Sequence, residues 1–227
     1  MVNTVGMLNY PINGLAIFYG PDFTSVDSIK GIAPEGHTFG AIGKIKVDNG
    51  YENLIFYRNS STNRLHSVRT DGTSPWSSFP ACEKGMIGLA DFNHDGWTEV
   101  YVGNKIFDAA TGKLLASGTG NSGRAALMGT YSSYVAHPQA VDILGDSNLE
   151  LVVGNQIYKV DIDRNAASAK ILQLISSVTP PSNCPSDGVT VVADFNNDGK
   201  LEVLVRQRGG TIINATNTII NLYLWSP

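Results

Sequence analysis

The chain has 227 residues, with 20 acidic residues against 16 lysines and arginines, and a formal net charge of −4. This length excludes a mini-protein held by metals or disulfides, and the lack of a basic excess argues against nucleic acid as a partner. Charged residues make up only 16% while glycines number 24, which favours β structure rich in turns over solvated helices, and no apolar run is long enough to insert into a membrane.

Short β-rich runs separated by turn residues follow one another along the whole chain, and helical periodicity is weak. Two runs precede the first repeated segment described below, and the others lie within the repeats. The predicted strands cover residues 15–19, 25–32, 86–92, 99–102, 105–107, 113–116, 149–153, 157–162, 170–178, 201–205, 211–214 and 219–225. A polar turn at Arg164-Asn165 separates two of them. The sequence therefore predicts an all-β protein.

Four segments are similar to one another. They read KIKVDNGYENLIFY from Lys44, ADFNHDGWTEVYVG from Ala90, VDILGDSNLELVVG from Val141 and ADFNNDGKLEVLVR from Ala193. Successive segments are separated by 46, 51 and 52 residues when they are aligned. A period near 50 residues with about four strands in each period is typical of the blades of a β-propeller.

Three of the repeats contain a nine-residue acidic loop, which we name the second (91–99), third (142–150) and fourth (194–202) acidic loops after their repeats. Acids occupy the first, fifth and ninth positions of each loop, so nine of the 20 acids fall within 27 residues, where uniform scatter would place about 2.4. Gly96 and Gly199 at the sixth position allow a sharp bend that turns the oxygens inward. Hard oxygen ligands at alternate positions suit Ca²⁺.

The predicted calcium ligands are side chains, together with the backbone carbonyl at each seventh position (Trp97, Asn148 and Lys200). They are Asp91, Asn93, Asp95, Trp97 and Glu99 in the second loop; Asp142, Asp146, Asn148 and Glu150 in the third; and Asp194, Asn196, Asp198, Lys200 and Glu202 in the fourth. We expect two sites, in the second and fourth loops. For the third loop, a calcium site and a plain turn are both compatible with the sequence, because Leu144 and Ser147 replace the asparagine and glycine.

Two other interpretations of these loops are an EF-hand and a plain Asx turn. An EF-hand would need a carboxylate at the twelfth position, where the loops have Val102, Val153 and Val205. Plain Asx turns form without any ion, but they do not require acids at the first and ninth positions. In the first repeat Ile45 and Asn49 stand where acids are expected, so we predict no metal there.

The D-x-N-x-D-G-x-x-E pattern between strands resembles the FG-GAP/VCBS repeat family, known from integrin α-chain propellers and from large bacterial secreted and surface proteins. The resemblance covers about residues 40–227. It implies a β-propeller of four-stranded blades with calcium at the blade loops. The units lie near 40–84, 85–134, 135–186 and 187–227, with a partial preceding blade in 1–39. Since related propellers have more blades, we expect an open arc of about four to five blades from a larger propeller, whose partners include further repeats or domains.

The expected function is a calcium-stabilised module of an extracellular or cell-surface protein, acting in adhesion or in recognition of a protein or glycan ligand. No nucleophile, phosphate-loop or zinc signature is present, which favours a non-enzymatic role without catalytic residues. The alternative is the propeller part of a polysaccharide-processing enzyme of lyase or hydrolase type. A pocket that combines calcium with an unpaired cationic side chain would favour the enzyme, whereas calcium sites sealed within single loops would favour the module.

Overall fold

The computed structural model describes residues 4–6, 14–19, 25–30, 40–59, 61–82, 85–119, 137–178, 189–209 and 219–225, with side chains for residues 40–59, 61–82, 85–119, 137–178 and 190–205. All regular structure in these ranges is β-strand, which confirms the all-β prediction. The described residues contain no helix long and apolar enough to cross a membrane. The strand expected over 211–214 lies outside the described residues.

Within the described residues, eighteen strands form five sheets. The first sheet contains β1 (Thr4–Gly6), β2 (Gly14–Tyr19) and β3 (Ser25–Lys30), and the second contains β4 (Ala41–Val47), β5 (Gly50–Arg58) and β6 (Leu65–Val68). The third has the order β14-β10-β9-β8-β7 and contains β7 (Ile87–Ala90), β8 (Glu99–Val102), β9 (Lys105–Asp108), β10 (Leu114–Ser117) and β14 (Lys170–Ile171).

The remaining two sheets are formed by strands between residues 139 and 225. The fourth sheet has the order β11-β12-β13-β15 and contains β11 (Gln139–Val141), β12 (Glu150–Val153), β13 (Gln156–Lys159) and β15 (Gln173–Ser177). The fifth contains β16 (Val189–Ala193), β17 (Glu202–Gly209) and β18 (Ile219–Trp225). All strand pairs except β10–β14 are antiparallel.

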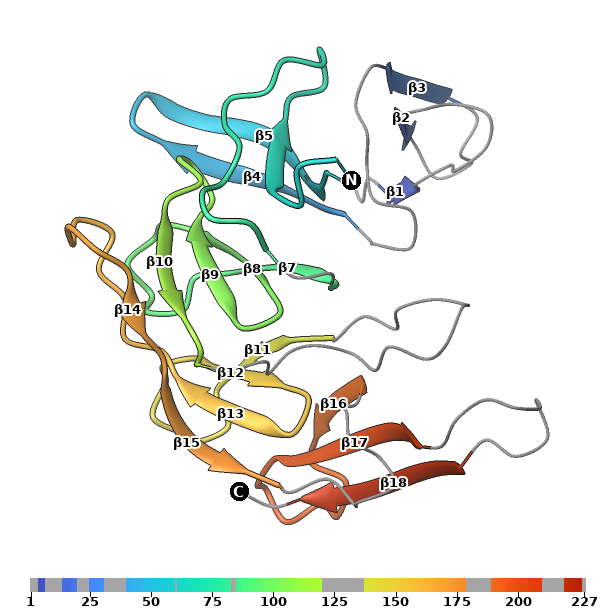
Figure 1. Cartoon of the computed structure of the whole chain (residues 1–227), viewed down its shortest axis with the longest axis vertical. Coiled ribbons are helices and arrows are strands. Elements are labelled where there is room, and N and C mark those ends of the chain that lie inside the picture. The colour runs from blue at the N-terminus through green and yellow to red at the C-terminus, as the bar shows by residue number, and fades with distance from the viewer. Residues whose placement is uncertain are drawn as a thin grey trace.

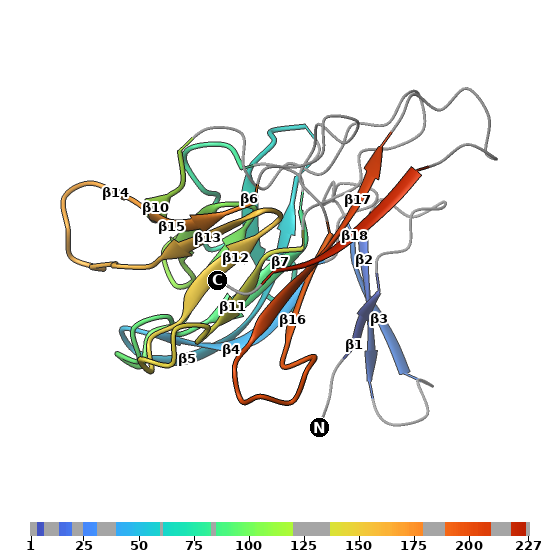
Figure 2. The same ribbon diagram turned by 90° about the horizontal axis from the view of Figure 1, so that it is seen from below.

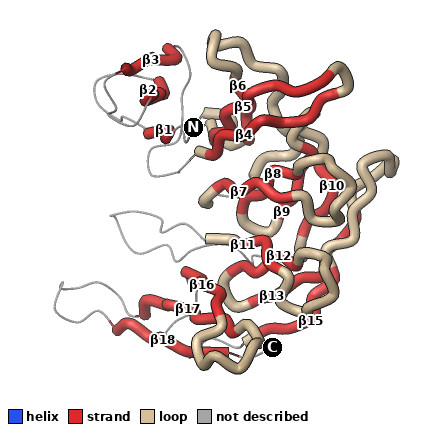
Figure 3. Tube along the Cα trace, turned by 180° about the vertical axis from the view of Figure 1, so that it is seen from behind, coloured by secondary structure: helices blue, strands red, loops and turns tan. Residues whose placement is uncertain are grey.

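The sheets follow one another in chain order along a curved row (Figure 1). The strands that open the second to fifth sheets follow one another along the row, with β4 next to β7, β7 next to β11 and β11 next to β16, and the view from below looks along this row (Figure 2). The Cα trace seen from behind gives the same order of sheets (Figure 3). Among the described strands, none of the first sheet pairs with a strand of the fifth.

Three apolar clusters fill the spaces between the second, third, fourth and fifth sheets. In β8, Val100 and Val102 pack with residues of the second sheet, whereas Tyr101 packs with residues of the fourth sheet. The sequence EVYV is therefore buried on both faces, as expected of a strand that lies between two other sheets. Likewise Val152 in β12 belongs to the cluster shared with the fifth sheet. The third and fourth sheets therefore each pack against a neighbouring sheet on both faces.

The segment 160–172, which we call the strap, leaves the fourth sheet after β13 and returns to it only at β15. On its way β14 pairs in parallel with β10 of the third sheet, with Ala116 opposite Lys170 and Ser117 opposite Ile171. Leu172, which separates β14 from β15, donates its backbone N–H to the carbonyl of Ser117 (2.9 Å). The prediction of one continuous strand over 170–178 is therefore wrong at its start, because the first two residues pair with a different sheet.

Candidate functional site

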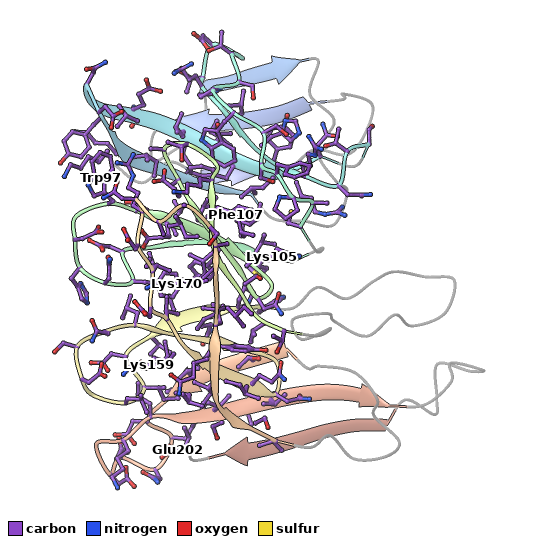
Figure 4. All side chains as sticks on the ribbon, turned by 60° about the vertical axis from the view of Figure 1, so that its left-hand side comes forward. Trp97, Lys105, Phe107, Lys159, Lys170 and Glu202 are labelled. Atoms are coloured by element: carbon purple, nitrogen blue, oxygen red, sulfur yellow. The ribbon has the colours of Figure 1, made fainter. Side chains whose placement is uncertain are left out.

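The three acidic loops occupy equivalent places in the fold. They join β7 to β8, β11 to β12 and β16 to β17, so each connects the first two strands of a sheet. Trp97 of the second loop and Glu202 of the fourth lie toward the same side of the molecule in Figure 4. The fold therefore presents the loops as a row along one edge of the successive sheets.

The loops share one backbone conformation. The fourth position is left-handed in each, with φ of 56° at His94, 72° at Gly145 and 59° at Asn197. The sixth position is also left-handed, with φ of 81° at Gly96, 74° at Ser147 and 86° at Gly199. Asparagine, glycine and histidine tolerate this region better than most residues, whereas serine does so less readily. The third loop therefore keeps the shape of the other two despite its different sequence.

The first-position aspartate fixes this shape by accepting two backbone hydrogen bonds. Asp91 accepts the N–H of Asp95 at Oδ1 (3.0 Å) and that of Gly96 at Oδ2 (2.9 Å). Asp142 and Asp194 make the corresponding pairs of contacts at 2.9–3.1 Å. Since a carboxylate oxygen has two acceptor sites, each of these oxygens keeps one for a further donor or a cation.

The fifth-position aspartate turns toward the residue two places later. Oδ1 of Asp95 accepts the N–H of Trp97 (2.8 Å) and Oδ1 of Asp198 accepts that of Lys200 (2.8 Å). The same contact joins Asp146 to Asn148 (3.0 Å). The predicted seventh-position ligands thus lie beside the fifth-position carboxylates, and each loop closes on itself.

The ninth-position glutamates are buried: Glu99, Glu150 and Glu202 are 3%, 0% and 1% exposed. Each accepts a backbone N–H of its own loop, from Phe92 in the second loop (2.9 Å) and Phe195 in the fourth (2.9 Å). In the third loop, Oε1 of Glu150 is buried and has no hydrogen-bond partner among the described residues. A buried carboxylate oxygen without a partner is unfavourable unless a proton or a cation meets it.

Burial raises the pKa values of two of these glutamates. Desolvation raises the pKa of Glu99 to about 8, and the nearby charges of Asp95, Asp91 and Asp108 add to the effect, while the hydrogen bond from Phe92 opposes it. Desolvation likewise raises the pKa of Glu150, with smaller contributions from Asp146 and Asp142. Both side chains therefore lie where a positive charge would be favourable.

The carboxylates of the fourth loop converge most closely. Oxygens of Asp194, Asp198 and Glu202 lie within 4.8 Å of one another, close enough to share a metal ion. The amide nitrogen of Asn196 donates to Asp198 (3.1 Å) and to Glu202 (3.3 Å), which draws these two carboxylates together. The residues present thus fit a hard divalent cation held within a single loop.

The other two loops, which lie within the described ranges, do not bring three carboxylates this close together. In the second loop the amide of Asn93 contacts only Asp95 (3.1 Å), and Glu99 is not bridged to it. In the third loop the third position is Leu144, which has no side-chain amide. Asp146 instead lies 3.6 Å from the ammonium of Lys159. The asparagine at the third position therefore accounts for part of the difference between the loops.

The first repeat contains no acidic loop. Residues 45–53 lie in a tight hairpin in which Ile45 pairs with Glu52 and Val47 with Gly50. Asp48 sits at the exposed turn and Asn53 in strand β5. The residues aligned with the acidic positions are thus spread along two strands, an arrangement unlike that of the three loops.

A cavity of about 280 Å³ lies beside the second acidic loop. Its lining includes Asn93, Asp95 and Trp97 from the loop and Asp163, Arg164 and Asn165 from the strap. The sequence indicated only a turn at 164–165, because no local pattern shows that this turn reaches another sheet. Arg164 is paired with the buried carboxylate of Asp108 and lies 3.7 Å from Asp48, so the cation in this cavity is already neutralised.

Comparisons with known proteins give a fold but no family. No known protein family and no curated protein matches the sequence. The structure is similar to the crystal structure of the V. cholerae biofilm matrix protein Bap1, with a TM-score of 0.64 and 15% sequence identity over 96% of this chain. This chain spans 34% of the length of that protein. At this identity the similarity shows that the chain shares its fold with part of a biofilm matrix protein.

Proposed function

We propose that the protein is a calcium-stabilised β-propeller module of an extracellular or cell-surface protein, acting in adhesion or ligand recognition. The observation that carries this proposal is the convergence of Asp194, Asp198 and Glu202 within 4.8 Å in a loop whose backbone recurs in two other sheets. Repeated sheets in a curved row, each beginning on the same side, support the propeller as the architecture.

The metal's proposed role is structural. Each loop is closed by hydrogen bonds between its own first, fifth and ninth acids and its own backbone. A cation there would offset the repulsion among clustered carboxylates and hold the first two strands of each sheet in place. The fold shared with a biofilm matrix protein supports an extracellular, adhesion-type setting.

The alternative, a polysaccharide-processing enzyme, receives less support. Such a site would combine calcium with an unpaired cationic side chain. In the described part of the chain, the cavity beside a candidate calcium loop has Arg164 as its cation, and this residue is paired with Asp108 and Asp48. An arginine neutralised in this way has no charge to spare for a substrate.

Thermal unfolding with and without calcium tests the proposal. At a dissociation constant of about 10⁻⁴ M, typical of weak extracellular sites, about 1 mM calcium stabilises each site by roughly 1.4 kcal/mol. For a chain of this size this corresponds to an increase in Tm of about 3–5 °C per site. Magnesium at equal concentration is the control for ionic strength. A Tm that is the same in EDTA and in calcium would overturn the proposal.

A further inference from the structure

The cavity between the second acidic loop and the strap is built from two walls, each supported by hydrogen bonds. On the strap side, the ammonium of Lys113 donates to the carbonyls of Arg164 (2.7 Å) and Ala166 (2.6 Å). The backbone N–H of Asn165 donates to Asp163 (2.8 Å), which closes the turn. On the loop side, Asp95 is fixed by its contacts with Asn93 and Trp97. Hydrogen bonds within the chain therefore support both walls of the cavity.

The charges of the walls select against an anion. The carboxylates of Asp95 and Asp163 line the cavity from opposite walls and would repel an anion. Arg164, the cation of the lining, is paired with Asp108 and Asp48 and offers an anion no compensating charge. The cavity therefore favours an uncharged ligand over an anionic one.

Five of the seven lining residues are polar or charged, with Trp97 and Ile162 as the exceptions, so the lining disfavours a wholly apolar ligand. Asn93 and Asn165 each offer a donor and an acceptor, while Asp95 and Asp163 offer acceptors only. A ligand that leaves these groups unpaired would lose their hydration without replacement. Hydroxyl groups, which both donate and accept, match this mixture.

We infer that this cavity binds a short stretch of a neutral polysaccharide, through hydrogen bonds from sugar hydroxyls to Asp163 and Asn165 on the strap and to Asn93 and Asp95 on the loop. The inference rests on the proposed function, because it names the ligand class and the place of recognition. At about 280 Å³ the cavity holds only a small part of such a chain, near the lower end of ligand sites.

Calcium in the second loop and sugar in the cavity would share Asp95 and Asn93. A cation in the loop would hold these two side chains in place, so that less ordering is left for the sugar to impose. We therefore expect tighter polysaccharide binding in calcium than in EDTA.

Affinity electrophoresis in native gels containing galactomannan, glucomannan or dextran, with about 1 mM calcium, tests the inference. At least one of these neutral polysaccharides should slow the wild-type protein. The variant Asn165→Ala should weaken that retardation about tenfold, the loss expected for removing one or two hydrogen bonds. Ser168→Ala is the matched control, since Ser168 is exposed on the strap outside the cavity lining and should leave retardation unchanged.

The outcomes separate this inference from the calcium proposal. Loss of retardation in Asn165→Ala with an unaltered increase in Tm on adding calcium supports the cavity site. Absence of retardation by all three neutral polysaccharides, or equal retardation of Asn165→Ala and the wild type, overturns it even where calcium raises Tm. Retardation by the anionic alginate alone overturns the choice of a neutral ligand. Retardation that is lost in Asn165→Ala in a protein indifferent to calcium supports the cavity and contradicts the calcium proposal.

Discussion

The guanidinium of Arg164 lies over the indole of Trp97, with 3.6 Å between its central carbon and the centre of the ring. Trp97 belongs to the second acidic loop of the third sheet, whereas Arg164 belongs to the strap that leaves the fourth sheet. Arg164 also pairs with Asp108 of β9 and approaches Asp48 of the β4–β5 turn in the second sheet. One side chain therefore links segments from three successive sheets.

Replacing Arg164 with alanine should destabilise the protein by about 2–4 kcal/mol. The variant removes the contact with Trp97 and leaves the carboxylate of Asp108, only 3% exposed, without its cation. Arg64→Ala is the matched control, because Arg64 lies over Phe79, which is 76% exposed, and should cost less than about 1 kcal/mol. Urea unfolding measures both. Equal losses in the two variants would show that Arg164 does not link the sheets.

In the calcium-free protein, Glu99 should contribute a loss of stability as pH rises from about 4.5 to 8. Burial raises the pKa of Glu99 from 4.5 to about 8, so in this range the folded state holds a proton that the unfolded state has released. The free energy of unfolding then falls with pH, by at most about 1.4 kcal/mol per pH unit for this group. Calcium should reduce the fall, because a bound cation stabilises the charged carboxylate.

The variant Glu99→Gln isolates this contribution. It resembles the protonated side chain, so its stability in EDTA should depend less on pH than that of the wild type. Burial lowers the pKa values of His66 and His137, which makes stability fall toward acid pH in both proteins and cancels in the difference. The measurement is urea unfolding in EDTA at several pH values. Parallel curves for the two proteins would contradict a proton held on Glu99.

Replacing the third-position asparagine should weaken calcium binding at the fourth loop more than at the second. Asn196 bridges Asp198 and Glu202, whereas Asn93 reaches only Asp95. We therefore expect Asn196→Leu, which imitates Leu144 of the third loop, to weaken calcium binding at its loop more than Asn93→Leu weakens it at the second. Isothermal titration of each variant with calcium measures the change. A larger effect of Asn93→Leu would contradict the bridging role of Asn196.

The sequence predicted the features that depend on residues close together in the chain. The ends of β18 coincide with those of the predicted strand at 219–225, and the carboxylates of the fourth loop lie close together as their spacing indicates. The course of the strap could not be predicted, because the pairing of β14 with β10 depends on which sheets become neighbours. For the same reason the contacts of Arg164 with Asp108 and Trp97 leave no local signal in the sequence.

Gly112 and Gly145 provide a matched test of packing beneath the turns. Both have left-handed backbones, with φ of 73° and 72°, so an alanine at either position should cost about 1 kcal/mol in backbone strain. A Cβ atom at Gly112 would lie 2.4 Å from the ring of Trp76, whereas one at Gly145 would have no neighbour within 4 Å.

The Trp76 ring cannot move aside easily, because its N–H donates to the carbonyl of Ala109 (3.1 Å) and it packs against Phe56. Gly112→Ala should therefore cost a further 1–3 kcal/mol, roughly the penalty of overpacking, for a total of about 2–4 kcal/mol. Gly145→Ala should cost only the backbone strain of about 1 kcal/mol. Urea unfolding in EDTA compares the two variants without any contribution from metal. If both lose the same stability, the indole of Trp76 is not held in place by Ala109 and Phe56, and the turn at Gly112 can shift without disturbing the cluster between the second and third sheets.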